Sequence, residues 1–362
     1  MAKKRISKQV AQKDIQPASG LWSLYAPEKA PHAFKARSVP ATRKWQQQTR
    51  KALARQLGLH RLKNAALEVD TLERVDKGDY TRDKLLLRTG PHTVMPVYVL
   101  LPREARRPLP TVLALHGHGY GVKDIVGLWE DGSERDQPDG YHKDFGVALC
   151  RSGFAVAAPE ISCFGERKTD FSHLHRTGLG SPLPPTCDHS AALASHLGIS
   201  AAGLRIHDAK RLVDYLETRK DLDTKRLGAM GISGGGFHTM YSTCLDRRIK
   251  AAVISGYFCT FKDSILAMHH CPCNFIPGLA AFGEMHDIGG LMAPRPALIE
   301  AASRDPIFPM PAVRKAVSKL RDVYAIFGAR ENVQTDYFEG RHEISGAKAY
   351  PFLRQQLGVS LD

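Results

Sequence analysis

The sequence predicts an α/β protein whose central sheet is mostly parallel and carries helices on both faces. After residue 109 the chain contains short runs that are mostly rich in Val, Ile, Leu and Ala and mostly lack alternation, as strands buried on both faces do. Helix-like stretches separate these runs, and such alternation is typical of parallel strands joined by right-handed crossovers. The runs read PTVLALHGHG, FAVAAPE, KRLGAMGIS, KAAVISGYF, PALIEAAS and VQTDYFEG.

The helices expected between these strands are DFGVALCRSG, SAAGLRIHDAKRLVDYLETRK, GGFHTMYSTCLDRR and PAVRKAVSKLRDVYAIFG. Earlier in the chain, three runs alternate in part and are separated by turns, which is typical of an antiparallel meander. They read ALEVDTLERV, KLLLRTG and VMPVYVLLP. We therefore expect antiparallel strands at the N-terminal edge of the sheet.

The chain divides into a basic N-terminal extension, residues 1–64, and a main domain, residues 65–362. Residues 1–40 are polar and rich in proline, so little regular structure is expected there, whereas 41–58 looks helical and stops at Gly58. The proline-containing stretch near 161–200 is expected to form an excursion, or cap, over the sheet edge.

The charge of the protein is concentrated in the extension. Residues 1–64 hold fifteen Lys and Arg against two acidic residues, whereas the formal charge of the whole chain is +14. A basic arm could contact nucleic acid or an anionic membrane, but no RNA-binding or helix-turn-helix signature accompanies it, so a solvated extension is the favoured interpretation. The oligomeric state stays open.

A cytosolic location is expected. The chain has no apolar run long enough to span a bilayer, and no apolar segment follows the basic start as in a secretory signal. Its seven cysteines are an odd number without framework spacing, which favours reduced thiols.

A nucleophile elbow is predicted where the strand KRLGAMGIS meets the next helix. Gly231-Ile232-Ser233-Gly234-Gly235 matches G-x-S-x-G, in which glycines let a strand and a helix pack around a sharp turn. The turn exposes the serine hydroxyl. A phosphate-binding loop needs a different glycine spacing, and neither known pattern fits.

The serine requires a base and an orienting acid, which should follow it in the order acid, then histidine. Asp305 follows the run PALIEAAS, and Pro306 biases it away from helical geometry; helix capping is its alternative role. His342 follows the last strand. Each residue lies after a strand, where active sites of open α/β sheets gather.

Oxyanion donors and pocket residues complete the predicted site. The backbone N–H groups of His118 and Gly234 are expected to bind the oxygen that becomes charged in the reaction. Four side chains are candidates for the substrate pocket: His116, Phe258, Cys259 and Glu166. Glu166 and the neighbouring Arg167 are expected mainly to hold their own loop.

These motifs together resemble the α/β-hydrolase superfamily. LALHGHG, FGER, GISGGGF, CPCNFIPGL with MAPRP, SRDPIFP and FEGRHE are similar to the dienelactone-hydrolase-like and acetyl-xylan-esterase-like branch, over residues 65–360. The resemblance implies an α/β-hydrolase fold, Ser233 as nucleophile, Asp305 as acid, His342 as base and an oxyanion hole at His118 and Gly234. Dienelactone hydrolases proper use cysteine, so serine favours an ordinary carboxyl ester.

The predicted activity is that of a serine carboxylesterase acting on short-chain esters, with acetylated sugars as a substrate class implied by the resemblance. No cofactor is expected. His269, His270, Cys271, Cys273 and the later His286 suggest zinc, but one residue between the cysteines is too few for a usual structural zinc motif, so no metal is expected. The alternatives are a prolyl-oligopeptidase-like peptidase, which would need a large gating domain, and a non-catalytic binding protein.

Overall fold

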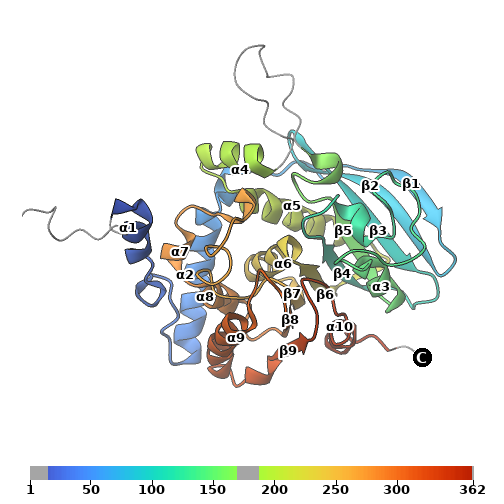
Figure 1. The fold of residues 1–362 in the computed structure, drawn as a ribbon. Coiled ribbons are helices and arrows are strands. Elements are labelled where there is room, and N and C mark those ends of the chain that lie inside the picture. Colours follow the sequence, from blue (N-terminus) through green and yellow to red (C-terminus); the bar gives the residue numbers. More distant parts are fainter. Residues whose placement is uncertain (1–14, 169–186, 361–362) are drawn as a thin grey trace, which may run out of the picture.

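Nine strands form a single sheet in the computed structural model, which describes residues 15–168 and 187–360 (Figure 1). The strands are β1 (Val69–Asp76), β2 (Tyr80–Gly90), β3 (Thr93–Pro102), β4 (Leu109–Leu115), β5 (Ala155–Pro159), β6 (Leu222–Ile232), β7 (Ile249–Ser255), β8 (Ala297–Ala302) and β9 (Val333–Phe338). Their order in the sheet is β1-β2-β3-β5-β4-β6-β7-β8-β9.

Strand directions follow the sequence prediction. The pairs β1–β2, β2–β3 and β3–β5 are antiparallel, and every pair from β5–β4 to β8–β9 is parallel. The predicted antiparallel meander and the parallel sheet that follows it are therefore confirmed. The carboxyl ends of β4, β6, β7, β8 and β9 consequently lie at one edge of the sheet, where the loops that follow them can meet.

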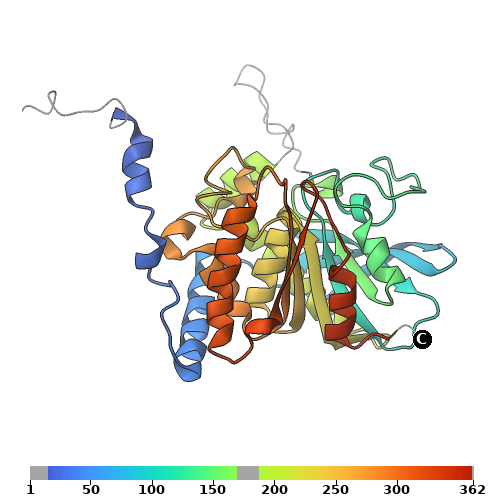
Figure 2. The same ribbon diagram turned by 60° about the horizontal axis from the view of Figure 1, so that its bottom comes forward.

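Helices cover both faces of the sheet (Figure 2). Alternate residues of β7 separate the two sides: Ala251 and Val253 share a core with α3 (Phe145–Arg151) and α10 (Ala349–Leu357), whereas Ala252 and Ile254 share another with α6 (Gly234–Leu245) and α9 (Met310–Ala325). The long α5 (Ala201–Leu216) packs beside α6. Successive side chains of a strand point to opposite faces of the sheet, so a strand that is apolar throughout needs helices on both faces to bury it.

The helix α2 (Val39–Gln56) confirms the helix predicted near 41–58. Ser38 caps its start, and Gly58, in a left-handed conformation, follows its end. Leu53 and Leu57 are fully buried in the main core, and the Gln46 amide donates to two backbone oxygens near residue 290. The second half of the basic extension is thus packed against the main domain.

Two regions differ in detail from the expectations. The helix α1 (Pro17–Ser23) lies in a stretch where little structure was expected, with Pro17 in its first turn, where proline is tolerated. The helix α10 was not predicted because Pro351 interrupts its short sequence, but this proline too lies near the helix start. The remaining short helices are α4 (Cys187–His196), α7 (Leu279–Phe282), α8 (Met285–Gly289), η3 (Pro27–Lys29), η4 (Leu59–Arg61), η5 (Val122–Ile125), η6 (Gly165–Arg167), η8 (Pro272–Asn274), η9 (Gly290–Met292) and η10 (Arg330–Asn332).

The predicted excursion at 161–200 falls only partly within the described residues. Its first part contains η6 and its last part contains α4, whereas residues 169–186 lie outside the description. Among the described helices, none is both long and apolar enough to cross a membrane.

Candidate active site

Ser233 stands alone between the end of β6 and the start of α6. Its backbone has φ 57° and ψ −122°, a conformation that non-glycine residues rarely adopt and that costs roughly 1–3 kcal/mol. Two hydrogen bonds hold the turn: the Ser233 N–H donates to the Ser255 oxygen at 3.0 Å, and the Phe237 N–H donates to the Ser233 oxygen at 2.9 Å. The chain therefore maintains a strained turn that presents this side chain.

The elbow glycines are required because backbone surrounds them. A Cβ atom on Gly235 would lie 2.6 Å from the carbonyl carbon of Leu115, and one on Gly231 would lie 2.5 Å from the oxygen of the same leucine. Neither neighbour is a flexible side chain that could move aside. Gly231 and Gly235 thus let β4, β6 and α6 approach one another around Ser233.

Asp305 and His342 form a hydrogen-bonded pair at the ends of β8 and β9. The Nδ1 of His342 lies 2.7 Å from Oδ2 of Asp305, so it donates its hydrogen to the carboxylate. The other carboxylate oxygen accepts from the N–H groups of Ile307 and Phe308 at 2.8 and 3.2 Å. Asp305 therefore holds its own turn with one oxygen and orients the imidazole with the other.

The second nitrogen of His342 is left available. Its Nε2 is buried and has no hydrogen-bond partner in the described chain. Because Nδ1 carries the hydrogen that Asp305 accepts, Nε2 is the nitrogen with a free lone pair. It can accept a proton from a group in the adjoining cavity.

A cavity of about 240 Å³ brings Ser233, Gly234, His118 and His342 together. Asp305 lies behind His342, outside the lining. The other lining residues are Tyr141, Tyr257, Met268, His269, His270, Cys271, Asn274, Ile307 and Phe308.

The loop after β4 lies directly against the elbow. A Cβ on Gly117 would lie 3.1 Å from the Cβ of Ser233, and one on Gly234 would lie 3.1 Å from Nδ1 of His118. The N–H of Gly234 is the first of α6, so helix geometry gives it no acceptor within the helix. The two residues predicted to supply oxyanion donors are thus neighbours beside Ser233.

Two residues that the sequence analysis missed hold this loop in place. The Gly117 N–H donates to Nε2 of His142 at 2.8 Å, and Nδ1 of His142 donates to the Asp124 carboxylate at 2.9 Å. Burial lowers the pKa of His142, which favours the neutral ring that this arrangement needs. Tyr141 donates its hydroxyl hydrogen to the oxygen of His118 at 2.5 Å. The stretch YHKD carries no motif that could have revealed them.

All four candidate pocket residues lie outside this cavity, which corrects the prediction. His116 is buried with both ring nitrogens bonded to backbone: Nδ1 donates to the Gly117 oxygen at 2.8 Å, and Nε2 accepts from Ile161 at 3.0 Å. Phe258 and Cys259 turn into the core, where the Cys259 N–H lies 3.1 Å from the sulfur of Met285.

Glu166 belongs to a surface ion pair with Lys84, 2.5 Å away. Arg167 donates to the Glu160 oxygen and pairs with Asp208 at 2.7 Å. Both residues hold the loop after β5, as the sequence analysis expected of them. Neither lines the cavity that contains Ser233.

A second, larger hollow of about 760 Å³ lies next to the cavity and shares Asn274 with it. Its walls are mainly apolar and come from α1, α4 and the segment 272–281. Ser233 and His342 line the smaller cavity, which is therefore the candidate active site despite its smaller volume.

The chain belongs to the Abhydrolase family, whose sequence model matches residues 26–345. The predicted resemblance to α/β-hydrolases and the predicted fold are thereby confirmed. The closer likeness to dienelactone hydrolases stays a prediction.

Named relatives agree with this assignment. YtaP of Bacillus subtilis (strain 168), a candidate hydrolase, is 28% identical over 275 residues, which cover 73% of this chain and 83% of that protein. A candidate acetyl xylan esterase from Bacteroides fragilis NCTC 9343 is similar in structure, with a TM-score of 0.76, 18% identity, and coverage of 96% and 97% of the two chains. A glucuronoyl esterase from Solibacter usitatus gives a TM-score of 0.60 at 16% identity, covering 91% of this chain and all of that one. At such identities the structural likeness establishes the fold alone.

Proposed function

We propose that this protein is a serine hydrolase that cleaves short-chain carboxylic esters through an acyl-enzyme. One observation carries the proposal. The His342–Asp305 pair, joined at 2.7 Å, faces the cavity onto which the strained elbow presents Ser233. A serine hydroxyl is a weak nucleophile, and an oriented imidazole is the group that activates it.

In the first half of the reaction, the Ser233 oxygen attacks the ester carbonyl while Nε2 of His342 takes the hydroxyl proton. Asp305 holds the imidazole in the required tautomer and stabilises the imidazolium that forms. The oxyanion binds to the backbone N–H groups of Gly234 and His118. In comparable sites, removal of one such donor raises the activation free energy by roughly 3–4 kcal/mol.

Collapse of this intermediate expels the alcohol, which receives its proton from His342. Water then attacks the acyl-enzyme, with the same histidine as base, and releases the acid and the free serine. His342 accounts for every proton transfer, so this chemistry calls for no cofactor.

The size of the cavity favours a small acyl group. At about 240 Å³ it is smaller than the ~300–1,000 Å³ of typical ligand pockets, and its apolar walls include Tyr257, Ile307 and Phe308. The structurally similar proteins include a candidate acetyl xylan esterase and glucuronoyl esterases, which are named for carbohydrate esters. We infer an acetyl or similarly short ester carried by a carbohydrate as the substrate class.

The test is hydrolysis of p-nitrophenyl acetate, butyrate and octanoate by the wild type, Ser233→Ala and the control Ser152→Ala, whose hydroxyl bonds a helix carbonyl away from the cavity. We expect acetate to be preferred and the activity to fall by several orders of magnitude in Ser233→Ala only. Acetylated xylo-oligosaccharides follow as the carbohydrate substrate. Equal rates for wild type and Ser233→Ala would refute the assignment of the nucleophile.

Two alternatives from the sequence analysis give different results in the same assays. A peptidase would cleave acyl p-nitroanilides with a kcat/KM comparable to that for the esters. A binding protein would be inert in the wild type. We favour the esterase because small esters fit the cavity and ester hydrolysis needs only the groups already present around it.

A further inference from the structure

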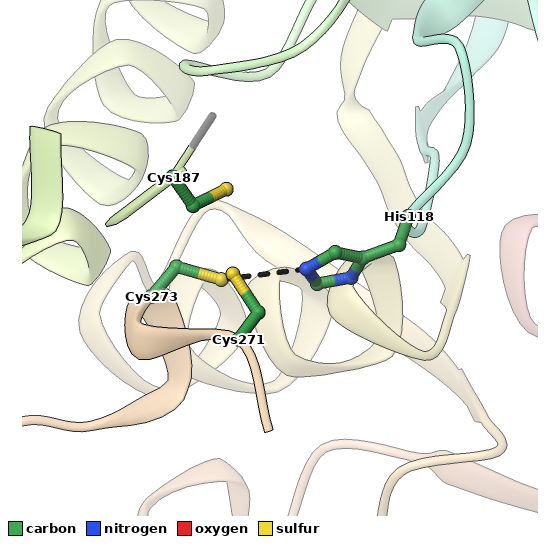
Figure 3. A group of neighbouring side chains, drawn as sticks. All are labelled: His118, Cys187, Cys271 and Cys273. Carbon is green, nitrogen blue, oxygen red and sulfur yellow. Dashed lines mark hydrogen bonds between the residues drawn. The ribbon is translucent and has the colours of Figure 1, made fainter. Parts of the chain in front are cut away.

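Three cysteines and one histidine converge beside the proposed active site (Figure 3). They are His118 in the loop after β4, Cys187 at the start of α4, and Cys271 and Cys273 on either side of Pro272. The imidazole nitrogen and the three sulfur atoms that could bind a metal all lie within 4.8 Å of one another. The side chains come from three segments that only the fold brings together.

One separation between the candidate ligand atoms agrees with tetrahedral coordination. Zinc binds sulfur at about 2.3 Å and nitrogen at about 2.0–2.1 Å, so tetrahedral ligands lie about 3.8 Å apart for two sulfurs and about 3.6 Å for sulfur and nitrogen. The Cys273 sulfur lies 3.6 Å from Nε2 of His118. Three sulfurs and one nitrogen form one of the ligand sets found in structural zinc sites, and thiolates select soft ions over magnesium or calcium.

The surroundings suit a negatively charged metal centre. A Zn²⁺ ion with three thiolates and a neutral imidazole carries one net negative charge. The guanidinium of Arg205, only 1% exposed, donates to the Cys187 sulfur at 3.5 Å and supplies one positive charge. The Asn274 amide donates to the Cys273 sulfur at 3.7 Å. Charge and hydrogen bonds around the ligands are therefore already provided.

The histidine is held in a ligating orientation. The ring of Phe164 packs edge-on against the ring of His118, with centroids 5.0 Å apart. With Nδ1 next to Gly234 and Nε2 turned toward Cys273, the imidazole separates the proposed oxyanion hole from the sulfur cluster.

We propose that His118, Cys187, Cys271 and Cys273 bind one structural Zn²⁺ ion through three thiolate sulfurs and the Nε2 of the imidazole. Binding releases the remaining thiol protons to solvent and leaves the oxidation states of zinc and sulfur unchanged. All four positions are filled by protein, so the ion has no open site for water or substrate. It ties α4 and the 271–273 turn to the loop that carries the His118 N–H.

The proposal revises the expectation of no metal. His269 and His270 line the cavity, and His286 lies on α8, 3.8 Å from Asp287. None of these three histidines belongs to the four-residue group found among the described residues. The sequence did not indicate the other two ligands, His118 and Cys187. Both lie far from the CPC stretch in sequence, at distances from it that match no known zinc motif.

The test uses full-length protein purified under reducing conditions from cells supplied with zinc. Elemental analysis should give about one zinc per chain for the wild type. X-ray absorption at the zinc edge should give three sulfurs at about 2.3 Å and one nitrogen at about 2.0–2.1 Å. Because these measurements use the wild type, they do not depend on any variant folding.

Matched variants locate the site. Cys273→Ala and Cys187→Ala should lose at least about tenfold in zinc affinity, since each removes one of four ligands. Cys150→Ala, which changes a buried cysteine on the other face of the sheet, should keep its zinc. Ser233→Ala should also keep it, which separates this proposal from the proposed esterase function.

Three results would overturn the proposal. The first is a wild type that stays metal-free after reduction and dialysis against zinc. The second is an unchanged zinc content in Cys273→Ala. The third is a disulfide among Cys187, Cys271 and Cys273 in the purified protein whose reduction does not allow zinc to bind.

Discussion

Tyr141 donates its hydroxyl hydrogen to the backbone oxygen of His118 across 2.5 Å, and its ring lies 5.4 Å from that of His342. Burial raises the pKa of this phenol, so the hydroxyl keeps its hydrogen over the working pH range. The tyrosine thereby fixes the residue whose N–H is proposed to bind the oxyanion.

Tyr141→Phe should therefore lower kcat by about tenfold or more while changing KM little. Tyr141 positions the N–H of His118, and the negative charge that this N–H is proposed to bind develops only in the transition state. The control is Tyr324→Phe, which removes a hydroxyl that donates to the Arg295 oxygen and does not line the cavity. Steady-state kinetics with p-nitrophenyl acetate measure both. An equal fall in kcat in the two variants would speak for a general effect on folding instead.

Asp305→Asn should leave the turn intact and remove most of the activity. The amide oxygen can still accept from Ile307, but the side chain no longer offers a second carboxylate oxygen to Nδ1 of His342. The wrong tautomer then leaves Nε2 protonated, and kcat should drop by about three to four orders of magnitude. Thermal unfolding of the same variant should stay close to that of the wild type; a large loss of stability with little loss of kcat would assign Asp305 to structure alone.

Gly235→Ala should destabilise the fold. The added methyl group would meet the backbone of Leu115 and His116, at 2.6 and 2.8 Å, and the strand cannot move without disturbing the sheet. We expect a loss of at least about 3 kcal/mol in the free energy of unfolding. Gly20→Ala is the control, since nothing lies within 4 Å of a Cβ there. Equal urea midpoints for the two variants would contradict this picture of the elbow.

His238 predicts a loss of stability in acid. Burial, with help from the charge of Arg205, lowers its pKa to about 3, and its Nε2 donates to the Arg205 oxygen at 2.8 Å. In the unfolded chain the group binds a proton near pH 6.5, so the unfolded state gains protons first as the pH falls. This one residue should lower the free energy of unfolding by about 1.4 kcal/mol between pH 7.5 and 5.5.

His238→Gln can keep a donor toward the Arg205 oxygen but cannot titrate. Urea unfolding of both proteins at the two pH values isolates the contribution of the histidine. The difference between them should grow by about 1.4 kcal/mol toward neutral pH in favour of the wild type. An identical pH dependence in the two proteins would show that the pKa of His238 is the same in the folded and unfolded states, as for an exposed histidine.

The sequence was sufficient to predict those parts of the candidate site that lie directly after strand ends. Ser233, Asp305 and His342 each follow an apolar run, and runs without alternation had to form buried parallel strands whose carboxyl ends meet. The glycine pattern around Ser233 was sufficient to predict the elbow as well, because only glycine lets the backbone of Leu115 approach so closely.

The parts that were not predicted depend on contacts between distant segments. Tyr141 and His142 lie in a long connection between β4 and α3 that has no periodicity to interpret. Phe258 and Cys259 follow β7, like true pocket residues, but their chain turns inward to the Met285 sulfur. A single strand end shows where a loop begins, but the direction of the loop is set by what it packs against.

A Ser233 nucleophile activated by His342 should react with an electrophile that resembles the transition state of ester hydrolysis. The most direct test is the intact mass of the protein after treatment with a fluorophosphonate probe, with peptide mapping of the modified residue. We expect a single adduct on Ser233 in the wild type, no adduct in Ser233→Ala, and slower labelling in Asp305→Asn. An unmodified wild type, or an adduct that persists in Ser233→Ala, would contradict this role of Ser233.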